Sequence, residues 1–515
     1  MHWKMPYPQR SNTESKPKQK GNLTMNLHQS SLLVLGLLLA LSGTAGAATA
    51  TWQTPGSAAN WNNGANWTGG TGVGGIPGTT DDVVIDGETG SASIVTLDAS
   101  PSIASVTISA DDTLRKDNSA SNRDLGANGS SILLNNAGTI VHDQGSGYLR
   151  LNFSTTGCAN SGAIRADGSG REMRFGLNNT LSLNNTGGLI EGVNGGTIGF
   201  NKAGTLTGGA LKSDSTSTIK VISNGSYTFA GVSVTNAGAF VWDHSSNGLD
   251  LYFTTSGGLT NSGTATFILS GTGGNSRNKV EFRSGTTLGN SGTLTIETTK
   301  SANIDTVSAY VEIQGGAAFI NSGTLNILNN RTGGSGDAYV NIKSAASFSN
   351  SGTVVITGDG TYGTAQLRSA IDLPNAGTMT VEGLGSSIQM AGQTLTQTAG
   401  TLDVKDGGSV VAATVAIDGG TLAGNGSIIL PPISQLPGKA VLLNTGKELR
   451  CSNEILPMYW KNADRFLHIK GLPRDRFGSP ETLVVRLDFD EPLSVSNREI
   501  AEFKGDKKMI PRGKT

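Results

Sequence analysis

A phrase of Asn, one further residue, Gly and then a strand-forming run recurs along this 515-residue chain. Asn290–Ile296 reads NSGTLTI, Asn321–Ile327 reads NSGTLNI and Asn350–Ile356 reads NSGTVVI. The copies recur at near-regular intervals, except for one step that is twice as long as the step before it. A period of about 20–50 residues is typical of a solenoid, in which each repeat packs on its neighbours. The copies begin at Asn136, Asn160, Asn185, Asn236, Asn261, Asn290, Asn321, Asn350 and Asn375.

Three degenerate copies extend the series. The long step, from Asn185 to Asn236, contains one at Thr207–Leu211, and two more follow at Thr398–Leu402 and Asp418–Leu422. With the nine that begin with Asn they make twelve copies between residues 136 and 422. A series of this length is enough for a continuous stack of coils with one shared core.

The residue pattern within the phrase selects the kind of solenoid. In Phe348–Ile356 the inward series is Phe348, Asn350, Gly352, Val354 and Ile356, which has the two-residue period of a β-strand. No helical apolar period occurs, and 73 glycines oppose helix. Leucine-rich and helical repeats are therefore excluded. We predict an all-β fold, a single-stranded parallel β-helix of ~25-residue coils spaced about 4.8 Å apart, with an N-terminal cap and a non-repeat C-terminal tail.

Each position of the phrase has a role in stacking coils. The Asn lies on the inward series, where its buried amide needs partners. The equivalent Asn one coil above or below supplies them, so we expect a ladder of Asn side chains. The Gly two residues later is expected to form a bend with positive φ. A catalytic residue is needed once and not twelve times, so the phrase is structural.

The phrase also carries a resemblance. Asn-Ser/Ala-Gly-Thr-aliphatic repeats at this spacing resemble the β-helical passenger repeats of bacterial autotransporters, filamentous haemagglutinin-like adhesins and related secreted surface proteins. The similarity covers about residues 51–430. It implies an exported bacterial protein that is secreted or exposed at the cell surface, with an adhesive or unassigned role.

The N-terminal residues contain an export signal. Ser31–Leu41 (SLLVLGLLLAL) has the length of a signal-peptide apolar region, and Ala45–Ala47 is a small-x-small cleavage site. We expect cleavage near Ala47–Ala48 and a mature body that does not span a membrane. Residues 1–24 are either a long basic extension or lie ahead of a start at Met25. The alternative interpretation of Ser31–Leu41 is a membrane anchor that is not cleaved.

Three tryptophans mark the beginning of the body. Trp52, Trp61 and Trp67 are followed by Ile76–Asp86 (IPGTTDDVVID). One interpretation is an aromatic platform for sugar rings. The preferred interpretation is an N-terminal cap, because an uncovered strand edge would recruit other chains. The opening pattern is similar to the start of many secreted β-helix proteins, which supports the cap.

The repeats end at a composition change. Pro431–Pro437 introduces a charged, Gly-poor tail, within which Thr482–Phe489 alternates like a strand. The tail is either a small appended domain or foreign reading frame, and we expect little order there. The predicted regions are 1–47 (extension and signal), 48–125 (cap and first coils), 126–430 (repeats) and 431–515 (linker and tail).

The best candidate binding site is a charged alternation in the repeats. Arg277, Lys279, Glu281 and Arg283 are spaced to point outward from one strand. The cations Arg277, Lys279 and Arg283 form a candidate stripe for an acidic glycan, and a solvated outer face is the alternative. The five histidines are scattered, and Cys158 and Cys451 are isolated. We therefore predict no catalytic residues, no metal site and no cofactor.

Charge and composition limit the partners. Residues 51–438 contain 18 Lys and Arg against 27 Asp and Glu, so this body does not attract nucleic acid. We predict a secreted or cell-surface monomer with a structural or adhesive role and no catalysis. Its expected partners are an extracellular polysaccharide or the surface of a host or neighbouring cell. The alternative is a carbohydrate-binding or polysaccharide-degrading (lyase or hydrolase) β-helix protein.

Overall fold

The fold is all-β, as predicted. The computed structural model describes residues 47–86, 91–127, 131–154, 156–176, 180–222, 225–243, 249–269, 277–299, 308–333, 335–390, 392–429, 436–442, 446–454, 466–470 and 485–488. The expected signal sequence at Ser31–Leu41 lies outside these residues. The described helical segments are two single turns, η1 (Gly64–Asn66) and η2 (Val73–Gly75).

The strands form three long sheets whose neighbours in space come from successive coils. Sheet A has 17 strands, all parallel to their neighbours except β3, which is antiparallel to β1. In spatial order sheet A contains β3 (Trp67–Thr68), β1 (Thr49–Trp52), β4 (Asp82–Ile85), β6 (Ser105–Ile108), β9 (Leu133–Asn136), β12 (Ala159–Asn160), β15 (Leu181–Asn184), β18 (Gly204–Thr207), β21 (Tyr227–Ala230), β24 (Leu249–Thr254), β27 (Arg277–Phe282), β30 (Ser308–Ile313), β33 (Ala338–Ile342), β36 (Ala365–Ser369), β39 (Ser386–Met390), β42 (Ser409–Val411) and β45 (Ser427–Ile429).

Sheet B has 15 parallel strands and sheet C has 13. Sheet B contains β2 (Ala58–Asn60), β5 (Ile94–Leu97), β7 (Thr113–Lys116), β10 (Thr139–His142), β13 (Ala163–Asp167), β16 (Leu189–Val193), β19 (Ala210–Ser213), β22 (Ser233–Asn236), β25 (Gly258–Asn261), β28 (Thr287–Asn290), β31 (Ala318–Asn321), β34 (Ser347–Asn350), β37 (Leu373–Asn375), β40 (Thr394–Gln397) and β43 (Thr414–Ile417). Sheet C contains β8 (Arg123–Leu125), β11 (Tyr148–Leu151), β14 (Glu172–Phe175), β17 (Thr197–Phe200), β20 (Thr218–Val221), β23 (Ala239–Asp243), β26 (Thr264–Leu269), β29 (Thr293–Thr298), β32 (Thr324–Asn329), β35 (Thr353–Gly358), β38 (Thr378–Glu382), β41 (Thr401–Lys405) and β44 (Thr421–Ala423).

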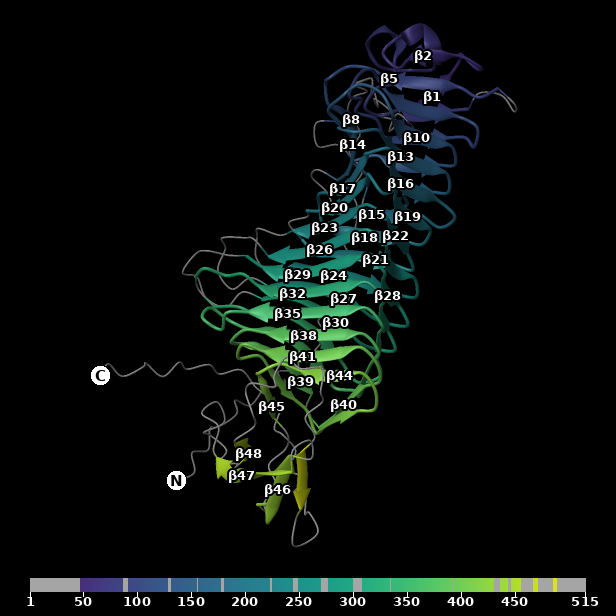
Figure 1. Ribbon diagram of the computed structural model, residues 1–515. Coiled ribbons are helices and arrows are strands. Elements are labelled where there is room, and N and C mark those ends of the chain that lie inside the picture. Colours follow the sequence, from purple (N-terminus) through teal and green to yellow (C-terminus); the bar gives the residue numbers. More distant parts are fainter. Residues whose placement is uncertain are drawn as a thin grey trace, which may run out of the picture. The chain divides into compact units, whose positions relative to one another are not determined.

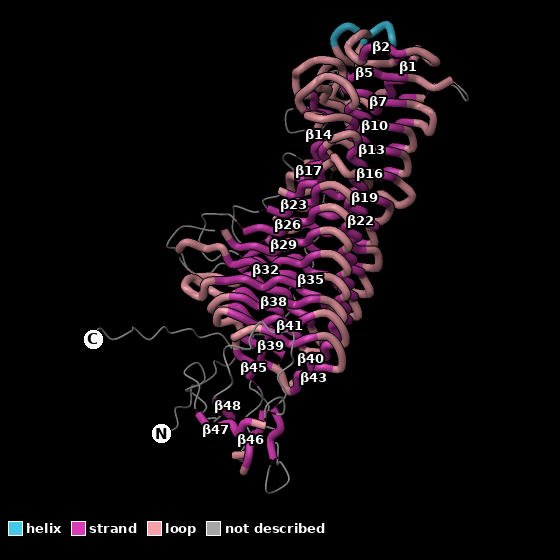
Figure 2. Tube along the Cα trace, viewed as in Figure 1, coloured by secondary structure: helices cyan, strands magenta, loops and turns pink. Residues whose placement is uncertain are grey.

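From β9 to β45 the chain visits sheet A, sheet B and sheet C in turn, so one coil consists of three strands. Figure 1 shows the strands stacked coil upon coil, and Figure 2 shows that loops connect them. The arrangement is the predicted parallel β-helix of ~25-residue coils. Alternate side chains point inward to a single continuous core, in which Ile296, Ile327 and Ile356 have no exposed surface.

The inward column at the turn from sheet B to sheet C, the B–C corner, contains an Asn ladder. Each Asn donates from Nδ2 to Oδ1 of the Asn one coil later, over 2.6 or 2.7 Å. Ser213 donates to the first Asn at 2.7 Å, and Gln397 accepts from the last at 2.6 Å. The ladder consists of Asn236, Asn261, Asn290, Asn321, Asn350 and Asn375.

A second, separate ladder lies at the turn from sheet A to sheet B, the A–B corner. Asn136 donates to Asn160 and Asn160 donates to Asn185, each over 2.6 Å. Asn185 then donates to the backbone oxygen of Gly208 at 3.4 Å, within the degenerate copy Thr207–Leu211. The twelve copies therefore belong to two corners of the coil and not to one series, which explains the long step that follows Asn185.

The expected role of the Gly in the phrase is wrong for most copies. Gly292, Gly323 and Gly352 do not have positive φ. A Cβ at each would lie 2.1 Å from the carbonyl oxygen of the equivalent Gly one coil earlier. Gly is required because the backbones of successive coils approach too closely for any side chain. The expected positive φ does occur in four copies, at Gly187, Gly209, Gly400 and Gly420.

The three tryptophans at the N-terminal end are buried. Trp52, Trp61 and Trp67 are 2, 1 and 6% exposed. Trp67 meets Trp52 and Trp61 edge to face, with ring centroids 4.9 and 4.8 Å apart. Strand β3, which begins at Trp67, pairs antiparallel with β1, the first strand of the parallel stack. These rings therefore do not form an exposed sugar platform, and their positions are those expected of a cap.

The tail contains an antiparallel sheet with its own small core. Its strands are β46 (Lys439–Leu442), β47 (Lys447–Glu454), β48 (Phe466–Lys470) and β49 (Val485–Asp488), in the order β48-β47-β46-β49. Ala440, Leu442 and Leu449 form the core. These residues have more regular structure than the composition predicts, and β49 lies within the expected strand Thr482–Phe489.

Candidate functional site

The charged stripe predicted on β27 lies on the outer face of sheet A, among polar and aromatic side chains from neighbouring coils. Val280 and Phe282 point into the core with no exposed surface. The side chains on the outer face of the sheet form two adjacent columns across strands β24, β27, β30, β33 and β36. We call these two columns the sheet A cluster. The first column contains Asp250, Lys279, Tyr310, Tyr339 and Gln366, and the second contains Tyr252, Glu281, Glu312, Asn341 and Arg368.

The coils widen where this cluster lies. Strands β24, β26, β27, β29, β30, β32 and β35 each have six residues, whereas most earlier strands have four. The repeat steps from Asn261 through Asn350 are correspondingly longer than those from Asn136 through Asn185. Insertions into a regular scaffold commonly carry function, because stacking does not require them.

Glu281 is the centre of the first half of the cluster. Its side chain is 1% exposed although it lies on the outer face. Lys279 Nζ lies 2.6 Å from one carboxylate oxygen, and Arg283 and Gln314 both donate to the other. Lys279 also lies 3.6 Å from Asp250, which accepts a 2.5 Å hydrogen bond from the Tyr252 hydroxyl. The carboxylates and cations therefore neutralise one another.

The pKa shifts of Glu281 and Lys279 are opposite in direction to those of a catalytic acid and base. Burial raises the pKa of Glu281, but hydrogen bonds from Arg283 and Lys279 outweigh it, and the pKa lies below its usual value. Burial lowers the pKa of Lys279, but pairing with Glu281 and Asp250 outweighs it, and the pKa lies above its usual value. A glycosidase acid needs a raised carboxyl pKa and a lyase base needs a lowered amine pKa.

The second half of the cluster is an aromatic stack with a polar edge. The rings of Tyr310 and Tyr339 are parallel, with centroids 4.5 Å apart. The guanidinium of Arg368 lies 3.9 Å from the centroid of Tyr339. Arg368 donates to Gln366 at 2.6 Å and lies 3.3 Å from Asp337. Burial raises the pKa of Tyr339 well above its usual value, so its hydroxyl stays protonated.

The structure brings together only part of the predicted stripe. Arg277 begins β27, but its side chain lies outside the described residues. Lys279 is 12% exposed and Arg283 is 41% exposed. Since both pair with Glu281, they do not form a free basic surface. The nine Asn positions of the phrase all lie in the two ladders or at their ends.

Sequence reasoning missed the aromatic and arginine members of the cluster. Tyr310 follows Lys279 by the same separation that joins Asn290 to Asn321. Tyr339 follows Tyr310 by one further local repeat step, so an alignment of whole coils contains the signal. Inspection of one strand at a time does not reveal it, because the members of the cluster come from different coils.

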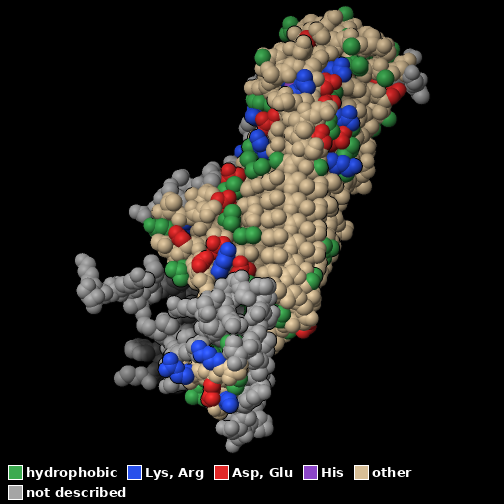
Figure 3. Space-filling model, viewed as in Figure 1, with side chains coloured by type: hydrophobic (Ala, Val, Ile, Leu, Met, Phe, Trp, Pro, Cys, Tyr) green, Lys and Arg blue, Asp and Glu red, His purple; other side chains and the backbone are tan. Residues whose placement is uncertain are grey.

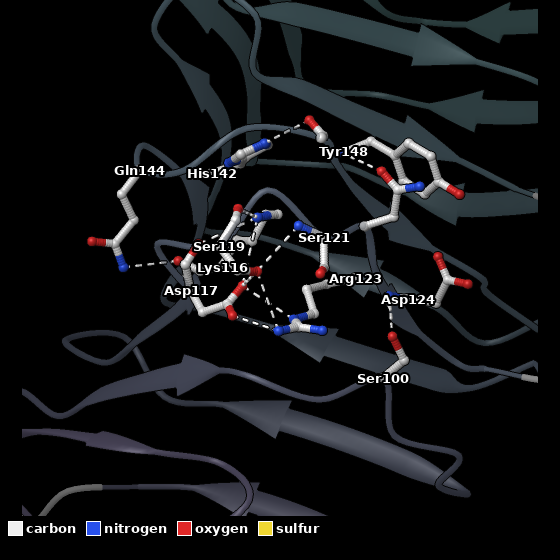
Figure 4. A network of polar contacts seen from close by, with 12 residues as sticks. Ser100, Lys116, Asp117, Ser119, Ser121, Arg123, Asp124, His142, Gln144 and Tyr148 are labelled. Atoms are coloured by element: carbon white, nitrogen blue, oxygen red, sulfur yellow. Dashed lines mark hydrogen bonds and ion pairs between the residues drawn. The ribbon is translucent and has the colours of Figure 1, made fainter.

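A second polar network lies near the N-terminal end and is structural. Lys116 and His142 are fully buried and occupy successive positions of the B–C corner column, in coils that precede the Asn ladder along the chain. Lys116 donates to the carbonyl of Ser119 at 2.8 Å, and Arg123 pairs with Asp117. His142 Nε2 lies 3.1 Å from the carbonyl of Gly147. Figure 4 shows these side chains anchoring the turns that follow β7 and β10.

Other classes of site find no support in the described part of the chain. Those residues contain no group of three or more His, Cys, Asp and Glu placed to hold a metal ion. Cys158 and Cys451 are free thiols. No helix among the described residues is long and apolar enough to cross a membrane. No protein-family model matches the chain, and no curated protein and no solved structure is significantly similar to it.

Proposed function

We propose that this protein is an exported bacterial β-helix with a structural and adhesive role, without catalysis, which acts at the cell surface or in the medium as a monomer. The observation that carries the proposal is the outer face of sheet B. From β22 to β43, eight successive strands contain no charged residue. Figure 3 shows this band of the surface, without charged side chains, where Figure 1 places β22 and β28.

An uncharged face of this length is suited to contact. Its outward side chains are mostly small or hydroxyl-bearing, as at Thr235, Thr260 and Ser349. Such a surface has no charge to desolvate, and its hydroxyls can replace bonds to water with hydrogen bonds to a neutral polymer or another cell surface. The Asn ladder at the B–C corner links the ends of β22, β25, β28, β31, β34 and β37, which keeps these strands in register and the face regular. This arrangement supports binding through a broad contact surface and not through a chemically reactive side chain.

The carbohydrate-binding alternative is favoured by a different observation. The sheet A cluster places Tyr339, Arg368 and Gln366 together on widened coils. Degradation of a polysaccharide is not favoured, because the pKa values of Glu281 and Lys279 are displaced away from neutrality.

Two measurements test the main proposal. Peptide mass spectrometry on cell fractions and medium of the native host is expected to find a mature terminus near Ala48 outside the cytoplasm. Recovery of the body in the cytoplasm would overturn the proposal. Cells carrying Thr260→Lys with Ser349→Glu are expected to adhere several-fold less than wild type to the same support. Thr295→Lys, on the outer face of sheet C, is the matched control and is expected to leave adhesion unchanged.

A further inference from the structure

We propose that the outer face of β30, β33 and β36 is a binding site for an uncharged oligosaccharide, with Tyr339, Asn341, Gln366 and Arg368 as the contacting residues. The inference rests on the carbohydrate-binding alternative above and specifies the residues and the class of ligand. The repeat itself does not explain these side chains, because stacking of the coils depends on the inward residues and the corners.

Charge balance on this face determines the ligand class. The described cations are Lys279, Arg283, Lys343 and Arg368, and the described carboxylates are Asp250, Glu281, Glu312 and Asp337. Each cation lies within 4 Å of at least one of these carboxylates. An anionic ligand that approaches one of these cations would also meet the negative charge of the carboxylate paired with it. An acidic glycan therefore gains no net attraction here.

Sugar hydroxyls fit the same groups without breaking an ion pair. A hydroxyl both donates and accepts, so it can bridge a carboxylate and a guanidinium that already lie side by side. Arg368 and Asp337 are 34% and 18% exposed, which leaves part of each group open to a ligand. Asn341, which donates to Glu312 at 3.3 Å, and Gln366 add amide groups on the same two columns.

The aromatic stack makes the site rigid. Tyr310 occupies one face of the Tyr339 ring and Arg368 occupies the other. A sugar ring therefore meets the edge and the hydroxyl of Tyr339 and does not stack on its face. Because the stack fixes Arg368 before binding, little side-chain entropy is lost when the ligand arrives. The columns run along successive coils, so a linear chain of sugars would lie across the strands.

The experiment uses the full secreted chain and defined probes. Binding of cellohexaose, xylohexaose and laminarihexaose is compared with binding of hexagalacturonate at 50 and 500 mM NaCl. We expect one neutral hexasaccharide to bind with an affinity that changes less than twofold between the two salt concentrations. Asn341→Leu with Arg368→Met is expected to lower that affinity at least tenfold. Arg165→Met, at a paired cation on sheet B, is the control and is expected to have no effect.

Each outcome decides the inference. Preferential, salt-dependent binding of hexagalacturonate would overturn the uncharged class while leaving carbohydrate binding in place. Binding of a neutral probe that is unaffected in the double variant would overturn the site. Failure of every probe to bind would overturn both the site and the carbohydrate-binding alternative. Circular dichroism of the double variant separates loss of the ligand contacts from loss of the fold, and Gln366→Ala provides a milder second test.

Discussion

Asn321 donates a 2.6 Å hydrogen bond from Nδ2 to Oδ1 of Asn350, which occupies the same position one coil later. Asn321 itself accepts a 2.7 Å bond from Asn290. Each amide in the ladder is thus donor to one neighbour and acceptor from the other. Because all three side chains are buried, the loss of one member leaves polar atoms without partners on both sides.

Asn321→Ala is therefore expected to destabilise the repeats by about 2–4 kcal/mol, since it leaves Asn350 Oδ1 without its donor and opens a small cavity. The urea midpoint, followed by circular dichroism, measures the loss. Ser322→Ala is the matched control, because its exposed hydroxyl makes only a 3.4 Å contact to a backbone oxygen. Equal losses in the two variants would contradict a structural role for the ladder.

The glycine of the phrase makes a separate prediction. Gly323→Ala would place a Cβ 2.1 Å from the carbonyl oxygen of Gly292, so the two coils must move apart. We expect a loss of about 3 kcal/mol. Gly316→Ala is the comparison, because Gly316 has a φ of +81° but nothing within 4 Å of the added carbon. It is expected to cost about 1 kcal/mol. A larger loss at Gly316 would show that backbone conformation, and not close approach, is the stronger constraint.

The repeat period and the two-residue alternation were sufficient to predict the parallel β-helix, because both follow from the stacking of identical coils. The phrase alone did not predict which of its copies lie at the A–B corner and which lie at the B–C corner. Asn185 and Asn236 have the same local environment, a strand before and a strand after them. Only the register of the strands between them shows that one lies at the A–B corner and the other at the B–C corner.

The candidate site was predictable in part. Alternation along β27 correctly places Lys279 on the outer face, because the period of a strand is a local property. The pairing of Lys279 with Asp250, and the stacking of Tyr310 on Tyr339, depend on contacts between residues about one coil apart. The burial of Glu281 also depends on those neighbours. The ion pair, the ring stack and the burial of Glu281 can be predicted only when the lengths of the widened coils are known.

Removal of one cap tryptophan is expected to loosen the first coils. Trp67 donates from Nε1 to the carbonyl of Trp61 at 2.8 Å and packs edge to face on two rings. Trp67→Ala should cost about 3–5 kcal/mol in the N-terminal coils and shift the tryptophan fluorescence to the red. Val73→Ala, at a side chain that is 95% exposed, is the control. Unchanged fluorescence and unchanged chymotrypsin resistance in Trp67→Ala would contradict the role of these rings as a cap.

The buried pair at the B–C corner predicts a pH dependence. Burial lowers the pKa of His142 below its usual 6.5, and the positive charges of Lys116 and Arg171 lower it further, whereas the hydrogen bond to Gly147 and the nearby Asp143 oppose the shift. Asp117, which pairs with both Lys116 and Arg123, lies in the same network. As the pH falls below 6.5, the unfolded chain binds a proton at His142 before the folded chain does. The contribution of His142 to folding stability is therefore full above pH 6.5 and is lost as the pH falls toward the lowered pKa of the folded state.

His142→Asn tests this dependence, because Asn fills the same column in later coils and carries no charge. The fall in urea midpoint from pH 7.5 to pH 5.5 is expected to be smaller in His142→Asn than in wild type. Lys116→Met should give an intermediate fall, since it removes one repulsive charge and leaves His142 buried. Titration of His142 by NMR should give a pKa below 6.5 in wild type and a higher value in Lys116→Met. An identical pH dependence in wild type and His142→Asn would show that other groups account for the acid sensitivity of the fold.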